Sequence, residues 1–378
     1  MAVQLPNLMS SHTPISEAEL LETRKPPPEL CGNSRVRDHV NIGQKLKILD
    51  FSSAATTSGW GFYFLLNEAE KLEQALVQYA KSVAQSYDYL PCSPPSLVYT
   101  DLGSACGFRP RDLHGEQQVY DIRQDVEAIK SKKPGLSLAG TAEIPFAAMQ
   151  TNSKMQSTDL PRRLVGSSRC YRAEAGARGK EARGLYRVHE FTKVEMFAWT
   201  LPGRETDVFN EMINIQREII SNLGLPFRRL EMPASDLGAS AFRKQDIEVW
   251  FPSRGRLHET QVKGKNTQMR EKDESESAGG GWGEVTSTSI CTDYQTRRLN
   301  TLVELPPGSK HKTQYPSTVN GTAMAVPRIL AALLECGWNA EDEAVHLPAC
   351  LWPYMNGQNM IRKPKSETKK PIAKSRSS

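Results

Sequence analysis

Several signatures of common protein classes are missing from this 378-residue sequence. No apolar run reaches the roughly 18 residues that a membrane-spanning helix needs. The seven cysteines, at positions 31, 92, 106, 170, 291, 336 and 350, never stand in C-x-x-C spacing. That pattern argues against a disulfide scaffold or a four-thiolate zinc site. We therefore expect no membrane association, and thiols that are reduced and mostly packed.

The common nucleotide and metal motifs are also missing. The sequence has no G-x-x-x-x-G-K-[ST] loop and no G-x-G-x-x-G run after a predicted strand. It has no H-E-x-x-H motif either, and its seven histidines are scattered. These absences argue against a P-loop, a Rossmann nucleotide site and a zinc hydrolase.

Positive charge is concentrated at one end of the chain. The formal net charge is +5, but residues 361–378 hold seven basic residues and one acidic residue, so the rest of the chain carries about −1. This distribution argues against a protein that coats nucleic acid. We predict that residues 356–378 are a basic disordered tail, the alternative being a specific RNA clamp.

The N-terminus does not have the composition of a targeting peptide. No Lys or Arg precedes Arg24, while Glu17, Glu19 and Glu22 add negative charge. A secretory signal or an organelle transit peptide would show the opposite pattern. Residues 1–34, rich in proline and polar groups, are predicted to be an extended lead-in.

The rest of the chain has a helix-and-strand pattern. Apolar residues recur at helical spacing over 68–86 and 208–219, and Pro327 starts a third helix that Gly337 ends. Residues 193–199 and 246–251 alternate as strands do. We predict an α+β fold, in which an antiparallel β-sheet is flanked by helices.

Residues 256–283 differ from their surroundings. They hold five basic and five acidic residues, few large apolar groups and three consecutive glycines. Such a segment cannot bury enough apolar surface to order itself. We predict a flexible insertion within a domain that spans 35–355.

The segment 169–195 is dense in Arg, Glu and Gly. Arg172 and Glu174 are two residues apart and would point the same way in an extended chain. More cations follow across a Gly-rich turn, at Arg178, Lys180, Arg183, Arg187 and Lys193. Such a loop can hold a triphosphate, although a solvent-exposed hairpin explains the charges equally well.

Two carboxylates suggest a binding site for a cation. Glu195 shares a strand face with Phe197 and Trp199, so it is expected to be partly buried and to need a cationic partner. A substrate ammonium would serve, as would Lys193 or an arginine. Thr141 and Glu143 form a second hydroxyl–carboxylate pair beside Gly140.

Taken in order, these segments resemble the class II aminoacyl-tRNA synthetases, and among them the bacterial and organellar branch of the seryl-tRNA synthetases. The resemblance runs from Arg35 to Met355. The 68–86 helix followed by D-Y-L-P-C-S-P-P-S-L resembles the first class II motif, with Pro95 at the motif proline and Asp88 where glycine is usual. In the family this motif builds the dimer interface, so the resemblance implies a homodimer.

The remaining motifs imply a site for serine and ATP. G-T-A-E-I-P at 140–145 resembles the serine-binding T-A-E loop, and C-Y-R-A-E followed by R-G-L-Y-R-V-H-E-F resembles the second motif. By this resemblance Thr141 and Glu143 bind serine and Glu195 binds its ammonium. Arg172 contacts the α-phosphate, Phe191 stacks on adenine, and Glu174 holds the adenine end.

Two further elements complete the resemblance. E-V-T-S-T-S at 284–289 resembles the E-x-x-S element, which implies that Glu284 and Ser287 hold Mg²⁺ against the phosphates. N-G-T-A-M-A-V-P-R at 320–328 resembles the third motif, which implies that Arg328 meets the γ-phosphate and that Asn320 and Thr322 line the serine pocket.

The function implied is that of a serine–tRNA ligase. Such an enzyme activates serine with ATP and transfers it to the 3′ end of serine tRNA. Carboxylate activation needs arginines, a divalent ion and carboxylates that grip an ammonium, rather than a protein nucleophile. The alternative is a synthetase-like binding or regulatory protein that no longer charges tRNA.

The sequence departs from the family in three further places. Ile290 replaces a usual asparagine and is expected to alter the pocket floor, and the 256–283 insertion directly precedes Glu284. Glu284 and Ser287 would face opposite sides of an ideal strand, so a shared metal requires a bulge.

The third departure is at the N-terminus, where the tRNA-binding coiled-coil arm of the family is missing. The L-P-N-L at 5–8 resembles the joint that follows that arm. We expect the sequence to be part of a longer chain, the alternative being a protein that recognises tRNA in a different way. The branch implies the mitochondrial matrix, and the cytoplasm is the alternative.

Overall fold

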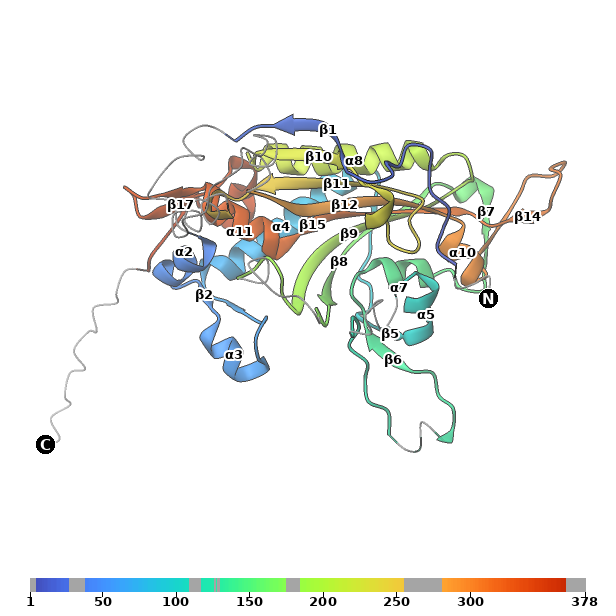
Figure 1. Cartoon of the computed structure of the whole chain (residues 1–378), viewed down its shortest axis with the longest axis horizontal. Helices are drawn as coiled ribbons and strands as arrows, with labels where there is room; N and C mark the ends of the chain where they lie inside the picture. The colour runs from blue at the N-terminus through green and yellow to red at the C-terminus, as the bar shows by residue number, and fades with distance from the viewer. Residues whose placement is uncertain are drawn as a thin grey trace, which may run out of the picture.

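An eight-stranded sheet organises the chain. The computed structural model describes residues 5–26, 38–108, 117–125, 127, 130–174, 184–254 and 281–364. Within these residues the strand order is β1-β10-β11-β12-β15-β9-β8-β4, and Figure 1 shows β10, β11, β12 and β15 side by side. All neighbours are antiparallel except β4 and β8, which confirms the predicted α+β architecture. The strands are β1 (Glu19–Arg24), β4 (Leu90–Pro91), β8 (Arg162–Tyr171), β9 (Glu190–Thr200), β10 (Phe227–Glu231), β11 (Arg243–Trp250), β12 (Trp282–Thr292) and β15 (Ser317–Ala325).

Three long helices, α4 (Glu68–Gln85), α8 (Glu205–Asn222) and α11 (Val326–Cys336), contact the sheet. Their apolar stripes are the ones that helical spacing predicts. Pro327 lies in the first turn of α11, and Gly337 follows its last residue. None of the helices in the described part of the chain is both long and apolar enough to span a bilayer.

The alternation along β9 divides the core into two layers. Val194, Met196 and Ala198 join the main apolar core, which contains residues of α4, α8 and α11. Phe197 and Trp199 point the other way, into a second cluster that includes residues of α7 (Glu143–Ala148). Each fully buried apolar side chain contributes roughly 1.5–3 kcal/mol to folding. The two-residue period of β9 therefore fixes the sheet between two apolar layers.

Short elements surround this frame. Residues 89–98, which contain three prolines, form only the brief strands β4 and the start of β5. The remaining elements are α2 (His39–Leu46), β2 (Leu49–Asp50), α3 (Ser52–Ser58), β3 (Phe64–Leu65), β5 (Leu97–Tyr99), α5 (Thr100–Ala105), β6 (Leu136–Leu138), β7 (Lys154–Gln156), α10 (Tyr294–Arg298), β13 (Leu302–Glu304), β14 (Thr313–Gln314), β16 (Trp338–Asn339), β17 (Ala344–His346), β18 (Met360–Arg362) and the 3₁₀ helices η2 (Ser157–Asp159), η4 (Ala234–Asp236) and η6 (Ala349–Met355).

The structure moves the predicted segment ends. Part of the 1–34 lead-in is strand β1, which pairs with β10 and so belongs to the sheet. The 356–378 tail is predicted too long, because β18 pairs with β17 and buries Ile361. Residues 365–378 lie outside the described residues.

The boundary of the insertion also changes. Residues 255–280 lie outside the described residues, but Trp282 and Gly283 already belong to β12. Trp282 is in register with Trp250 of β11, and their rings meet edge to face at 5.3 Å. This aromatic pair favours strand pairing. Because three glycines directly precede Trp282, the sequence pattern assigned Trp282 and Gly283 to the insertion instead of the strand.

Candidate functional site

The predicted site residues converge on two adjoining cavities. The larger, of about 660 Å³, is lined by Thr141, Glu143, Arg172, Glu195, Glu284, Ser287, Asn320 and Thr322. The smaller, of about 50 Å³, is lined by Glu174, Phe191 and Arg328, and it shares four residues with the first: Arg172, Lys193, Glu284 and Thr322. The structure therefore brings together all of the positions named above as serine, ATP or metal ligands.

Glu143 lines the larger cavity and is the first residue of α7, directly after the T-A segment. Its side chain accepts a hydrogen bond from Gln295 Nε2 (2.6 Å) and one from Asn320 Nδ2 (3.1 Å). Gln295 is held in turn by Thr318, whose hydroxyl donates to the Gln295 carbonyl oxygen at 2.7 Å. Asn320 thus contacts the Glu143 carboxylate as well as the cavity. Gln295, on α10, was not predicted as a site residue, because its contact with Glu143 spans 152 positions of sequence.

A second carboxylate, Glu195, lies nearby on β9 and is only 1% exposed. Its partner is Lys193, whose Nζ is 2.5 Å from Glu195 Oε2. Lys193 Nζ also donates to the Thr141 hydroxyl at 2.6 Å, and the Thr322 hydroxyl donates to Glu195 at 3.3 Å. Of the partners that the sequence left open, the structure therefore shows Lys193.

Glu195 contributes to the electrostatic environment of Glu143. Burial raises the pKa of Glu143 to about 7, and the negative charge of Glu195 adds to the increase. Lys193, the Gln295 hydrogen bond and Arg172 act in the opposite direction. Near neutral pH this carboxylate is therefore poised between its charged and neutral forms.

A β-bulge places Glu284 and Ser287 on the same side of β12. Ile247 of β11 pairs with Thr286, but the next residue, Glu248, pairs with Glu284, so Val285 is the extra residue. This confirms the predicted irregularity, and both side chains line the larger cavity. A carboxylate and a hydroxyl suit Mg²⁺, which takes few protein ligands and completes its shell with water and phosphate oxygens. Within the described ranges no three His, Cys, Asp or Glu side chains gather as a metal site.

Arginines occupy the nucleotide side of the site. Arg328 Nη1 donates to the Glu284 carbonyl oxygen at 2.8 Å and lies 3.4 Å from its carboxylate. The Arg172 guanidinium lies 5.3 Å from the centre of the Phe191 ring. Glu174 pairs with Arg187 at 3.3 Å. Partial burial favours neutral Glu284, but Arg328, Lys244 and Arg172 outweigh it and lower its pKa.

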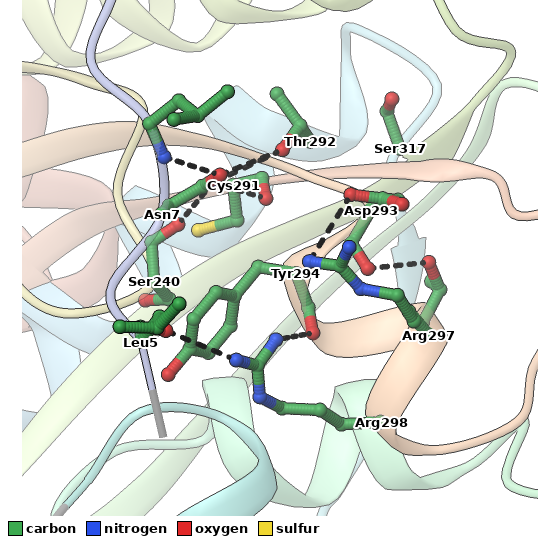
Figure 2. A network of polar contacts seen from close by, with 12 residues as sticks. Leu5, Asn7, Ser240, Cys291, Thr292, Asp293, Tyr294, Arg297, Arg298 and Ser317 are labelled. Carbon is green, nitrogen blue, oxygen red and sulfur yellow. Dashed lines mark hydrogen bonds and ion pairs between the residues drawn. The ribbon is translucent and has the colours of Figure 1, made fainter. Parts of the chain in front are cut away.

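The N-terminal segment contacts Ser240, which lines the larger cavity, and Figure 2 shows Asn7 beside Ser240 and Cys291. Asn7 Nδ2 donates to the carbonyl oxygens of Ser240 and Cys291, both at 2.9 Å, and contacts the Thr292 hydroxyl at 3.0 Å. The Cys291 thiol then donates to Asn320 at 3.4 Å. The segment predicted as a lead-in therefore reaches Glu143 through hydrogen bonds that run from Asn7 to Cys291 and Asn320.

Ile290 differs from its expected placement. It is buried in the main core beneath the sheet, whereas Ser287 and Ser289 of the same strand line the cavity. The apolar replacement therefore fits the core, and the prediction that Ile290 alters the pocket floor is wrong at the level of side-chain placement.

Known proteins are similar to this chain in sequence and in fold. Residues 126–336 match the tRNA synthetase class II core domain (G, H, P, S and T). The mitochondrial serine–tRNA ligase of Saccharomyces cerevisiae is 40% identical over 359 residues, covering 94% of this chain and 72% of that protein. The serine–tRNA ligase of Rhodopirellula baltica is 38% identical over 357 residues, with coverages of 93% and 74%. The structure of seryl-tRNA synthetase from Pyrococcus horikoshii complexed with ATP is similar with a TM-score of 0.81 at 28% identity, covering 96% of this chain and 77% of that one.

Proposed function

Since the chain belongs to the serine–tRNA ligase family of class II aminoacyl-tRNA synthetases, we propose that its two adjoining cavities activate serine with ATP. The chain is an aminoacyl-tRNA ligase that forms seryl-adenylate and transfers the serine to the 3′ end of serine tRNA. The observation that carries the site assignment is the convergence of positions from five separate parts of the sequence on one pair of cavities.

Glu195 and Glu143 provide the serine end of the site. In this proposal the Glu195 carboxylate binds the substrate ammonium, while Thr141, Thr322 and Asn320 complete the serine pocket around Glu143. A site lined with buried polar groups discriminates against analogues that lack the matching hydroxyl, since those groups would be left unpaired. Serine should therefore be preferred over alanine and glycine.

The nucleotide end must stabilise negative charge. The serine carboxylate attacks the α-phosphorus, the bond to the bridging oxygen breaks, and pyrophosphate leaves. Arg172 would contact the α-phosphate and Arg328 the γ-phosphate, with Phe191 and Glu174 holding the adenine. Mg²⁺ bound by Glu284, Ser287 and the ATP phosphates would neutralise phosphate charge.

Serine-dependent exchange between ATP and pyrophosphate tests this proposal directly. The full chain is assayed without tRNA, with serine, threonine, alanine and glycine in parallel. Exchange with serine alone is expected. A folded protein that shows no exchange would overturn the assignment of the site. Charging of serine tRNA, measured with radiolabelled serine, then tests the second step.

The alternative of a synthetase-like protein without charging activity is not favoured. A degraded site would be expected to have lost a core arginine or carboxylate, and Arg172, Arg328, Glu195 and Glu284 all remain around the cavities.

The assembly and location of the chain are further parts of the proposal. We place one catalytic domain over 5–364 and a homodimer interface at the segment of α4, β4 and β5, where Leu90, Leu97 and Tyr99 are exposed. Sedimentation equilibrium tests the dimer. The similarity to a mitochondrial relative supports mitochondrial localisation, which imaging of the tagged full-length protein tests.

A further inference from the structure

Lys193 occupies the position that the proposed function gives to the substrate. Its ammonium lies 2.5 Å from Glu195 and donates to Thr141 at 2.6 Å. The proposed function gives that carboxylate to the serine ammonium, and it places the Thr141 hydroxyl in the same serine pocket. A second cation at these oxygens would be repelled by the Lys193 ammonium, so serine and Lys193 compete for Glu195.

The Lys193 side chain has space for a second position. Lys193 lines both the larger cavity and the smaller one, as do Arg172, Glu284 and Thr322. It lies on β9, whose backbone is fixed between β8 and β15. Only the flexible four-carbon side chain needs to move, and that movement carries the ammonium from the serine pocket toward the nucleotide pocket.

The charge balance favours such a movement. The pocket holds two buried carboxylates, Glu143 and Glu195, and Lys193 neutralises one of them. Serine brings an ammonium, which can take over Glu195, and a carboxylate, which arrives without a cation of its own. A buried Lys193 released from Glu195 requires a new anionic partner.

We propose that Lys193 is a catalytic residue that exchanges partners: it yields Glu195 and Thr141 to the serine ammonium and binds the serine carboxylate beside the α-phosphate. This inference rests on the proposed function. The exchange requires no proton transfer, and no covalent bond to Lys193 forms or breaks. Its charge would hold the attacking carboxylate close to the phosphate, which otherwise repels it.

The test compares serine with serinol, which has the ammonium and hydroxyl of serine but no carboxylate. Binding to the parent chain and to Lys193→Met is measured by calorimetry without ATP. Serinol should bind the variant at least tenfold more tightly, because its internal competitor is gone. Serine-dependent pyrophosphate exchange should fall at least a hundredfold in kcat, as for other lost transition-state contacts.

Two further variants separate this role from a structural one. Lys193→Gln keeps a donor for Thr141 without the charge and should behave like Lys193→Met, which guards against misfolding. Arg243→Met is the matched control, since it breaks another buried ion pair of the sheet, with Glu231 at 2.8 Å. It should lower the melting temperature while leaving serinol affinity unchanged.

Serinol affinity that is unchanged, reduced or undetectable in both folded Lys193 variants would overturn the exchange. So would a kcat within a few-fold of the parent. Failure of the proposed function is a separate result, because it would appear as absent serine-dependent exchange in the parent chain itself.

Discussion

Glu284 and Ser287 face one cavity because Val285 bulges out of the pairing between β11 and β12. Three residues apart on a regular strand, they would face opposite sides of the sheet. The irregularity therefore creates the one arrangement in which both can serve a single metal ion.

Replacing Glu284 by Gln should weaken metal-dependent activation. The amide is a poor ligand for Mg²⁺, and it also removes the charge that pairs with Arg328 at 3.4 Å. We expect serine-dependent exchange to fall about a hundredfold, with half-maximal activity shifted to higher Mg²⁺ concentration. Glu248→Gln is the control, since Glu248 is the register partner of Glu284 but pairs with Arg228. Equal losses in both variants would contradict the assignment.

Arg172→Ala should remove a contact to the transferred phosphate. By analogy with lost oxyanion donors, the transition state should lose about 3–4 kcal/mol of stabilisation, so that kcat/KM for exchange falls a few hundredfold. Arg169, near the end of β8 and three residues before Arg172, is 46% exposed; it provides the matched Arg→Ala control and should stay within a few-fold of the parent. Activity of Arg172→Ala in that same range would refute its role.

Serine affinity should depend on pH through Glu143. The pKa of its buried carboxyl is about 7, and the ionised form is the one that favours a nearby ammonium. The KM for serine should therefore decrease severalfold from pH 6 to pH 8, measured by pyrophosphate exchange at saturating ATP. Glu143→Gln should flatten this profile, and an equally steep profile in the variant would assign the titration to another group.

The same group should influence stability. Because the folded pKa of Glu143, about 7, lies above its ordinary value of 4.5, the folded chain keeps a proton that the unfolded chain releases between these pH values. Its contribution to the free energy of unfolding therefore declines as pH rises from 4.5 to 7, by about 3 kcal/mol. Denaturant titrations at pH 5 and pH 8 should show a smaller decline in Glu143→Gln than in the parent.

Asn7→Ala should impair serine binding from a distance. Losing the donor leaves the Ser240 and Cys291 carbonyl oxygens without that partner, which costs about 1–2 kcal/mol. We expect the KM for serine to rise about tenfold while the KM for ATP changes little. Leu8→Ala, at an exposed neighbouring position, is the control. A parallel rise in both constants would indicate general destabilisation instead.

Deleting residues 262–278 should leave serine-dependent exchange nearly intact. These residues lie within the predicted insertion. The strands that flank it, β11 and β12, are paired at Trp250 and Trp282, so their pairing does not depend on the deleted residues. A hundredfold decrease in a folded deletion variant would show that the insertion contributes to the site.

Local sequence patterns predicted the main helices and strands, because each such pattern depends only on residues that are close together in the sequence. The apolar spacing of α4 and the alternation of β9 require only local geometry. The irregularity between Glu284 and Ser287 followed from their spacing together with the shared metal that the family resemblance implies. The partners of the site residues could not be predicted in this way. Gln295 meets Glu143, and Asn7 meets Cys291, only after the sheet has brought distant segments together.

The two edge strands of the sheet differ in how readily each can pair with another copy of the chain. At one edge, Glu22 of β1 is held by Arg217 at 2.7 Å and by Arg229 at 3.3 Å, so charged side chains guard the strand against further pairing. At the other edge, β4 is two residues long and Leu90 is 57% exposed. In the proposed homodimer, a second copy that pairs at β4 would leave the charged β1 strands as the outer edges of the described sheet. Such an assembly would stop at a closed pair instead of continuing into a filament.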